Sequence, residues 1–453
     1  MIRFKDIVDS KCGIRYCFEQ LELCSGVARR MLLETCMMES GEEIRSSYLS
    51  MLEAVRILDD ADVYECIIAN LCQLHDIGPT IARLGNGEVL DDIELFEIKH
   101  LALISSKVRT KLGTLSLCSD KSECKLPVPD DLEALIDILD PDGLRINSFY
   151  IYDSYSPELA ALRNRIRHSD GRDKEEAYVE ASGLEASIRA AISSRAKGFA
   201  ERLSGALSSL ALLDIVVAKA KMMEDKGYVI PKIVSEREAG SYEGLYHPEI
   251  ASRLEKEGKN FQPIDFSFSQ GPTLLVGINM GGKSVLLKML ALAQYLTQFG
   301  FAVPATSARV SVMEDIFLVS GDAESSTEGL SSFAGEIKSI EKVIEASRSG
   351  KKTLALIDEP ARTTNPVEGT ALVSALTVIL EEMGTVTVIT THYDTPDVKC
   401  RCMRVKGYMD GKMDYSIIDA GEAGVPHEAI DTARRLGADR RWMELAYKFV
   451  EKR

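Results

Sequence analysis

The stretch LLVGINMGGKSVLLKMLALAQ, residues 274–294, contains the pattern G-x-x-x-x-G-K-S from Gly277 to Ser284. An apolar run precedes the pattern and a helical periodicity follows it, which is the strand–loop–helix context of a phosphate-binding loop. Its glycines let backbone N–H groups approach phosphate oxygens, and the positive end of the following helix dipole adds to the attraction. We expect Lys283 to reach the β- and γ-phosphates and Ser284 to hold Mg²⁺.

Length and charge narrow the classes of protein that fit. A chain of 453 residues is too long for one ordinary core, so two or three domains are expected. The 54 Lys and Arg against 70 Asp and Glu give a net charge of -16, which repels nucleic acid at long range. DNA binding would therefore need a local basic patch.

Other features of the composition predict a cytoplasmic location. The first residues, MIRFKDIVDS, show no secretory signal, and no apolar run is long enough to span a bilayer. The ten cysteines include no C-x-x-C pair, so neither a cysteine metal site nor disulfides are expected.

The pattern along the chain changes near its middle. Residues 1 to about 240 show apolar residues at spacings of three and four, which predicts successive helices. From about residue 261, short β-rich runs (TLLVG, TLALIDE and VTVITTH) alternate with helical segments, which is typical of an α/β domain with a parallel sheet. The predicted fold class is thus α + α/β, and a tail from residue 421 is predicted to form two small helices.

Two adjacent acids follow the apolar run TLALI. Asp358 and Glu359 would then lie at the end of a strand beside the phosphate loop. There Asp358 could hold Mg²⁺ through water, and Glu359 could orient or deprotonate the attacking water. The alternative is a solvated turn, but a phosphate loop about 75 residues upstream favours catalysis.

A histidine ends the run VTVITTH. A lone histidine is more often structural than catalytic. However, polar residues at the carboxyl ends of parallel strands face the ligand site, and this places His392 where the γ-phosphate would lie. We therefore interpret His392 as a phosphate-sensing residue.

Taken together, GINMGGKS, LALIDEPARTTNPVEGTAL and ITTHYD resemble the ATPase domain of the MutS family, whose members are relatives of the ABC-type ATPases. The segment QFGFAVPATSARVSVMEDIF is similar to the family's chain after the first helix. EGLSSFAGEI resembles its serine-containing loop, with Ser331, Ser332 and Phe333 standing where the family has Ser-Thr-Phe. That loop contacts the nucleotide held by the other subunit.

The resemblance also implies particular site residues. LYHPEI and FQPIDF resemble the segment whose aromatic residue stacks on adenine, which implies Phe261, and Asn279 matches the family's loop asparagine. The implied cofactors are ATP and Mg²⁺. The implied catalytic residues are Glu359, His392 and Lys283, and the implied metal ligands are Ser284 and Asp358. The implied nucleotide-binding residues are Gly277, Asn279, Met280, Gly281, Gly282, Lys283, Ser284, Val285, Phe261 and Ser331.

The helical half is similar to the same family. YIYDSYSPELAALRNRI and LALLDIVVAKAKMMEDKGYVIPKI resemble its lever and core helices, closest to the branch that lacks a mismatch-reading domain. SIIDAGEAGVPHEAIDTARRL resembles its closing segment. The resemblance implies a core and lever domain over 1–240, a P-loop ATPase domain over 241–420, and a helical dimerisation segment over 421–453. The partner would be a second copy or a related subunit.

Several departures concern DNA. No Phe-x-Glu, the family's mismatch wedge, occurs in the first 150 residues, and we expect no nuclease domain after the ATPase. About twenty residues separate Arg167 from Ser187, too few for long clamp arms. PARTTNP replaces the usual Gly-Arg-Gly-Thr run, which affects the roles of Arg362 and Thr364. RNRIRHSDGRDK is a candidate DNA contact, but its acids favour a solvated helix end.

Two clients are compatible with these features. The first is mismatched or branched DNA, as in mismatch repair or recombination control. The second is a protein, because short relatives of the family resemble ATPases that accompany cobalamin-dependent aminomutases. A metabolic kinase ranks third, since no acceptor-substrate domain is apparent.

Overall fold

The structure is a computed structural model, and it describes residues 2–115, 126–235, 240–277, 282–320, 332–393, 398–409, 412–421, 433–434 and 437–450. The chain divides into two compact units. The sheet unit comprises Met1–Gln20, Cys36–Arg45 and Met223–Arg453, and the helical unit comprises Leu21–Thr35 and Ser46–Met222. Residues near the start of the chain thus belong to the sheet unit, where α2 contacts α12 and α13, which the sequence pattern does not indicate.

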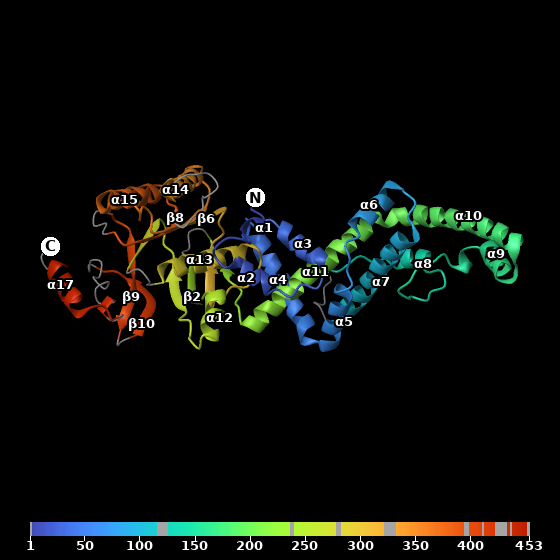
Figure 1. Cartoon of the computed structure of the whole chain (residues 1–453), viewed down its shortest axis with the longest axis horizontal. Coiled ribbons are helices and arrows are strands. Elements are labelled where there is room, and N and C mark those ends of the chain that lie inside the picture. Colours follow the sequence, from blue (N-terminus) through green and yellow to red (C-terminus); the bar gives the residue numbers. More distant parts are fainter. Residues whose placement is uncertain are drawn as a thin grey trace. The chain divides into compact units, whose positions relative to one another are not determined.

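The helical unit is built from amphipathic helices, as the three- and four-residue spacing predicts. Its helices are α3 (Gly26–Glu34), α4 (Gly41–Asp59), α5 (Ala61–Leu71), α6 (Gly78–Asn86), α7 (Asp92–Thr114), α8 (Glu133–Leu139), α9 (Pro157–His168), α10 (Gly171–Ala196) and α11 (Ala200–Lys226). Two 3-10 turns lie at Asp153–Tyr155 and Lys197–Phe199. Helices α4 and α11 also contribute residues to the sheet unit. Caps set the helix starts: the Asp91 carboxylate accepts the N–H of Glu94, and Glu94 reaches back to the N–H of Asp91. Two residues join α9 to α10, which form a helical hairpin (Figure 1).

One helical stretch in this half has the length and apolar composition of a membrane span. It covers Gly171–Lys226, which contradicts the prediction that no apolar run is long enough. Within its most apolar window, 72% of the residues are buried inside the protein. The core helix of a soluble protein passes the same test of length and composition.

The sheet unit contains two sheets and the helices that cover them. A small sheet has the strand order β1-β5-β2-β3, where β1 is Lys232–Ile233, β5 is Ser307–Val310, β2 is Ser241–Leu245 and β3 is Ile264–Ser267. The helices of the unit are α1 (Phe4–Ile7), α2 (Ile14–Glu19), α12 (Pro248–Lys256), α13 (Lys283–Gln298), α14 (Ser332–Arg348), α15 (Pro366–Glu382) and α17 (Arg440–Val450).

The second sheet has six strands in the order β10-β9-β4-β8-β7-β6. They are β4 (Pro272–Val276), β6 (Asp315–Ser320), β7 (Thr353–Asp358), β8 (Val386–Thr391), β9 (Arg401–Met409) and β10 (Lys412–Asp419). All pairs are parallel except β9 with β10. The predicted α + α/β fold class, with helices first and a parallel sheet after them, is confirmed.

Helices cover both faces of the centre of this sheet, which explains why β4, β7 and β8 are almost continuously buried. Helices α14 and α15 lie side by side on one face, and α13 packs against β6, β7 and β8 (Figure 1). The core beneath α14 and α15 consists of Leu274, Val319, Ile340, Val343, Ala355, Ile357, Val373, Leu376, Leu380, Ile389 and Tyr393.

The register of this sheet brings the ends of its central strands together. Val276 pairs with Thr391, Asp358 with Thr390, and Ser320 with Asp358. The prediction that the strand of Asp358 lies beside that of the phosphate loop is wrong, because β8 separates β7 from β4. All three strands nevertheless end at the same edge, where ligands bind in open α/β sheets.

Candidate nucleotide-binding site

The phosphate loop joins β4 to α13, as its flanking pattern predicts. Its first glycine, Gly277, has φ 151°, and Gly282, which precedes α13, has φ 79°. Residues with a Cβ rarely adopt these values, so the pattern's two fixed glycines are required by the backbone. Asn279, Met280 and Gly281 lie outside the described residues.

Lys283 points back toward the sheet edge rather than into solvent. Its side chain is 4% exposed, and Nζ donates to the carbonyl oxygen of Gly277 at 2.6 Å. The same Nζ lies 3.0 Å from Oε1 of Glu359. The loop and the end of β7 are thus joined by an ion pair across β8.

Glu359 is held in an uncommon backbone conformation. It has φ 47°, and Ala361 two residues later has φ 61°; both values are costly for residues other than glycine. The N–H of Glu359 donates to the carbonyl oxygen and to Oγ1 of Thr390, at 3.1 and 2.9 Å. The neighbouring strand therefore fixes the direction in which the Glu359 side chain leaves β7.

Two buried groups hold the second strained residue. The N–H of Ala361 donates to Oε1 of Glu336 at 2.8 Å, and the Tyr393 hydroxyl donates to the Ala361 carbonyl at 2.8 Å. Burial raises the pKa of Glu336. The hydrogen bond from Ala361 and the charge of Arg362 oppose this rise. Gly369 leaves the room for Tyr393, since a Cβ there would lie 2.4 Å from its ring.

Asp358 and Ser284 are the two expected metal ligands. Oδ1 of Asp358 accepts a hydrogen bond from the Thr390 hydroxyl at 2.7 Å, which orients the carboxylate. Ser284 is the second residue of α13, and its side chain is exposed. Among the described residues no group of three or more His, Cys, Asp or Glu side chains could hold a metal. A site of few protein oxygens suits Mg²⁺, which keeps water and phosphate oxygens as ligands.

His392 follows β8 and lies at the same edge. Partial desolvation lowers the pKa of His392; the charge of Glu359 opposes this shift, while Lys283 and Arg362 add to it. The imidazole is therefore mainly neutral at pH 7 and has one N–H to donate.

Arg362 is 54% exposed, with Nη1 3.8 Å from Oε2 of Glu359. Thr364 donates to Glu368 at 3.2 Å.

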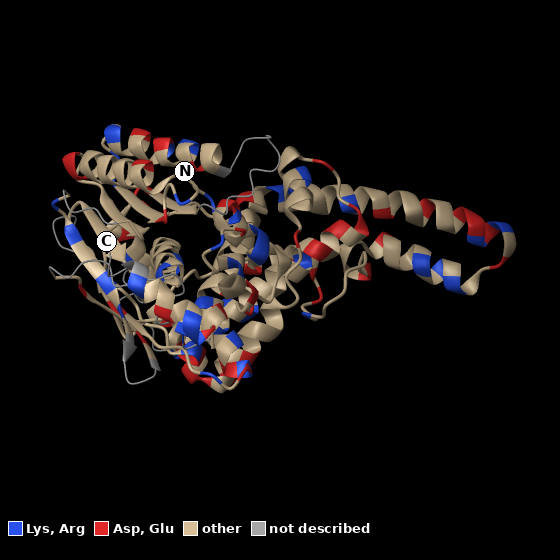
Figure 2. Ribbon diagram, turned by 60° about the vertical axis from the view of Figure 1, so that its left-hand side comes forward, with Lys and Arg blue, Asp and Glu red and all other residues tan. Residues whose placement is uncertain are grey.

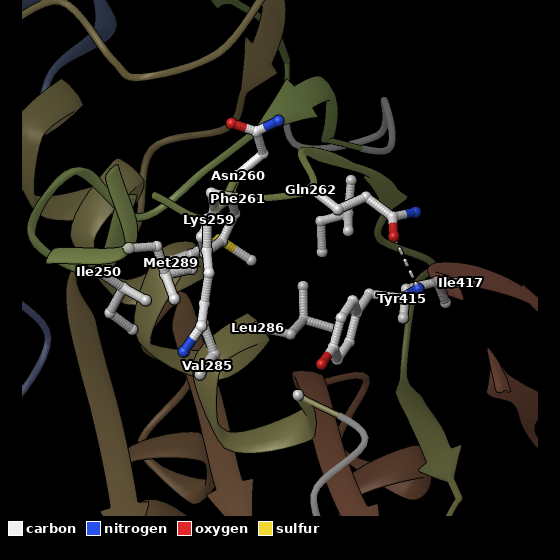
Figure 3. Close-up of a pocket in the computed structure, with 13 residues that line it drawn as sticks. Ile250, Lys259, Asn260, Phe261, Gln262, Val285, Leu286, Met289, Tyr415 and Ile417 are labelled. Carbon is white, nitrogen blue, oxygen red and sulfur yellow. Dashed lines mark hydrogen bonds between the residues drawn. The ribbon is translucent and has the colours of Figure 1, made fainter. Parts of the chain in front are cut away.

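A cavity of about 360 Å³ adjoins the phosphate loop (Figure 3). Its size lies in the range of small-molecule sites. The lining residues come from α12, the following loop, β3, the last residue before α13, α13 and β10: Ile250, Leu254, Lys259, Asn260, Phe261, Gln262, Ile264, Gly282, Val285, Leu286, Met289, Tyr415 and Ile417. The cavity thus brings Phe261 and Val285 together with Gly282 of the phosphate loop.

Several residues of this site carry no signal that sequence reasoning used. Tyr415 lines the cavity from β10, far along the chain, and Glu336 reaches the Ala361 turn from α14. Thr390 was detectable, since it precedes His392 by two residues at a strand end. Ser331 lies outside the described residues, as does most of its loop.

A glycine-flanked segment before α13, a strand-end acid pair and a parallel sheet with this register are features that P-loop nucleotide-binding domains share. Comparison with known proteins points to a family. A family profile described as MutS domain V matches residues 273–407. This match and the relatives below support a MutS-family ATPase, because domain V is the ATPase domain of MutS-family proteins.

Curated relatives extend the similarity beyond that domain. An "Endonuclease MutS2" of Staphylococcus haemolyticus is 24% identical over 82% of this chain and 56% of its own length. An "Endonuclease MutS2" of Ruminiclostridium cellulolyticum is 30% identical over 51% of this chain and 28% of its own. A "DNA mismatch repair protein MutS" of Brevibacillus brevis is 29% identical over 58% of this chain and 32% of its own length. The chain therefore spans between about a quarter and just over half of these relatives.

Proposed function

We propose that this protein binds ATP with Mg²⁺ and hydrolyses it at the edge formed by β4, β7 and β8. The observation that carries the proposal is the ion pair between Lys283 and Glu359, 3.0 Å long and largely buried. The pair supports the proposal because Lys283, the proposed phosphate-binding cation, and Glu359, the proposed water-orienting acid, are in contact although 76 positions separate them in sequence (359 − 283).

The residues have distinct roles in this proposal. Backbone N–H groups at the start of α13 and the ammonium of Lys283 bind phosphate oxygens, which replace Glu359 as the partner of Lys283. Ser284 and Asp358 would hold Mg²⁺, which would neutralise charge that develops on the phosphates. Glu359, released from Lys283, orients and deprotonates the attacking water. The neutral His392 donates its N–H toward the γ-phosphate.

The cavity beside the loop is proposed to take the adenine base. Phe261 supplies an aromatic ring, and Val285, Leu286 and Met289 supply an apolar wall from α13. An apolar slot with few polar groups is typical of nucleotide-base sites.

Substitution of Lys283 tests the binding site. We expect Lys283→Ala to weaken MgATP binding by about 100-fold or more, because a buried charge-assisted contact to phosphate is lost. Lys288→Ala, a lysine further along α13, is the matched control and should bind as the wild type does. Isothermal titration calorimetry measures both. Equal MgATP affinity in Lys283→Ala and wild type would reject the site.

We also propose that two subunits complete the ATP sites, with Ser331 acting on the nucleotide of the partner, and that ATP shifts the long helices between two arrangements. The support is the resemblance of the GLSSF loop to the family's trans-acting loop. Mixing Ser331→Ala chains with Lys283→Ala chains should restore some ATPase activity, since each mixed dimer has one intact site. Mixed dimers without activity would count against action in trans.

For the client, the names of the relatives support DNA, so we propose a role in mismatch repair or recombination control in the cytoplasm. The charges favour a second candidate, a protein client such as an aminomutase. Arg163 pairs with Asp153 and Glu185, and Arg165 with Asp173 and Glu180. These arginines are already neutralised within the hairpin region, and the net charge of -16 repels phosphate.

Fluorescence anisotropy with duplex and branched DNA separates these candidates. At about 150 mM salt, surface charges act over roughly 8 Å, so weak phosphate contacts are lost. Submicromolar, ATP-dependent affinity there would establish the DNA role. Loss of binding with and without ATP, together with ATP-dependent co-purification of a protein, would establish the protein client.

A further inference from the structure

One half-buried side chain next to the base cavity, Gln262, makes more polar contacts than its position in a loop requires. Its Nε2 donates to Oδ1 of Asp414 at 2.9 Å and to Oγ of Ser416 at 3.2 Å. Its Oε1 accepts the backbone N–H of Tyr415 at 3.1 Å (Figure 3). We call these three contacts the Gln262 bridge.

The bridge meets β10 where its pairing is interrupted. The register between β9 and β10 shifts between Asp414 and Ile417, so Tyr415 and Ser416 lie in a β-bulge. A bulge redirects a side chain and leaves backbone groups without ladder partners. Here side chains replace the ladder: Gln262 accepts the N–H of Tyr415, and Asp414 accepts that of Ser416 at 3.0 Å.

The charged end of the bridge is itself fixed. Oδ2 of Asp414 lies 2.8 Å from Nζ of Lys406 on β9. Contacts from Lys406, Ser416 and Gln262 hold the pKa of the Asp414 carboxyl well below its usual range. The acceptor for Gln262 therefore stays ionised at all pH values near neutrality.

The two segments that the bridge joins both line the cavity. Phe261 precedes Gln262 directly, and Tyr415 follows Asp414 directly, so each contributes a ring beside a bridge residue. The Tyr415 ring also approaches the phosphate loop, because a Cβ on Gly282 would lie 3.2 Å from its Cδ1. The bridge thus sets the separation of the two segments that would hold a base.

We propose that Gln262 is a positioning residue for the nucleotide base, acting through the bulge of β10 and not by contact with phosphate. This inference rests on the proposed binding of ATP at this site. Each polar atom of its amide already has a partner in the bridge, so Gln262 orders the walls of the slot and does not read the base. Loss of the bridge should then weaken binding of ligands with a base and spare ligands without one.

Calorimetry with two ligands tests this distinction. For Gln262→Met, which keeps the length of the side chain and loses its hydrogen bonds, we expect the Kd of MgATP to rise about fivefold to tenfold. The Kd of magnesium tripolyphosphate should stay within about twofold of wild type, because Lys283 and the loop are untouched. Gln262→Asn, too short to span the bridge, should give the same pattern if Gln262→Met fails to fold.

Asp419→Ala is the matched control, since Asp419 lies on β10 outside the bridge and its ion-pair partner, Arg401, is 3.9 Å away. It should leave both affinities unchanged. An equal loss for tripolyphosphate and ATP, or no loss for either, in a folded Gln262→Met protein would overturn the inference. A wild type that binds neither ligand would instead reject the proposed ATP site, and with it this role.

Discussion

The edge of the six-stranded sheet and the α9–α10 hairpin both contain basic residues close to acids, but the arrangements differ. At the sheet edge, Lys283 and Glu359 are 4% and 12% exposed, and strand register and packed side chains fix both. On the hairpin, Arg165 is 40% exposed and pairs with acids of the neighbouring helix. Figure 2 shows basic and acidic segments close together along α9 and α10.

This difference shows how a charged site can be told from a solvated charged surface. At the sheet edge an incoming phosphate would replace a single carboxylate, and the groups are ordered before it arrives. On the hairpin Arg163 and Arg165 already pair with nearby acids, so an external phosphate would compete with them. Surface pairs of this kind contribute little to stability.

A buried histidine of the sheet unit should make the stability of the protein depend on pH near neutrality. The hairpin arginines cannot do so, because they stay charged at these pH values. Burial lowers the pKa of His247 to about 4, with Lys288 and Arg253 acting in the same direction and a backbone bond at Cys12 opposing them. Between pH 6.5 and 4 the unfolded state binds the proton and the folded state does not, so stability falls as pH falls through this window. The full loss is about 3 kcal/mol, of which about 2 falls between pH 7 and 5.

His247→Asn is the test, because asparagine also caps a helix and does not titrate. His247 accepts the N–H of Ile250 at 3.5 Å at the start of α12. Urea unfolding at pH 7 and pH 5 should show a smaller loss of stability in the variant than in wild type. An identical loss in both proteins would show that His247 is not the group responsible.

The same substitution should have opposite signs in the two regions. Gly369→Ala would place a Cβ 2.4 Å from the Tyr393 ring, which holds the Ala361 turn, so we expect a loss of about 1–3 kcal/mol of stability and slower ATP turnover. Gly183 in α10 has open space around its Cβ position, and Gly183→Ala should stabilise by up to about 1 kcal/mol. Thermal melting measures both. A lower melting temperature for Gly183→Ala than for wild type would contradict the open space around this position.

The smallest effect is expected from the hairpin arginines. Replacing Arg163 and Arg165 together by alanine should change DNA affinity by less than about twofold at about 150 mM salt, because their charges are already paired. Anisotropy with branched DNA is the measurement. A drop of tenfold or more would show that these arginines contact phosphate, and the contrast with the sheet edge would fail.

Much of the sheet edge could be predicted from sequence because its residues follow apolar strands or glycines directly. Lys283, Asp358, Glu359 and His392 each lie at the end of a short pattern, and the structure brings Lys283, Glu359 and His392 within electrostatic reach of one another. The order of strands could not be predicted in the same way, since nothing in TLALIDE or VTVITTH specifies a neighbour. β8 consequently lies where β7 was expected.

Residues that act through tertiary contacts could not be predicted from sequence patterns. Nothing in EGLSSFAGEI marks Glu336 as buried, yet it is 4% exposed and accepts the N–H of Ala361. Gln262 and Tyr415 are 153 positions apart and meet only through a bulge. Ala361 lies within PARTTNP and has φ 61°, a conformation that an alanine in the sequence does not predict.

The strand-end acid Glu359 is proposed to serve hydrolysis and not binding. The most direct measurement is the Kd and the steady-state turnover of MgATP for Glu359→Gln beside wild type. We predict a Kd within about threefold of wild type and a turnover at least about 100-fold lower, because a general base or water-orienting group is lost while the phosphate contacts remain. Wild-type turnover in Glu359→Gln would contradict the account.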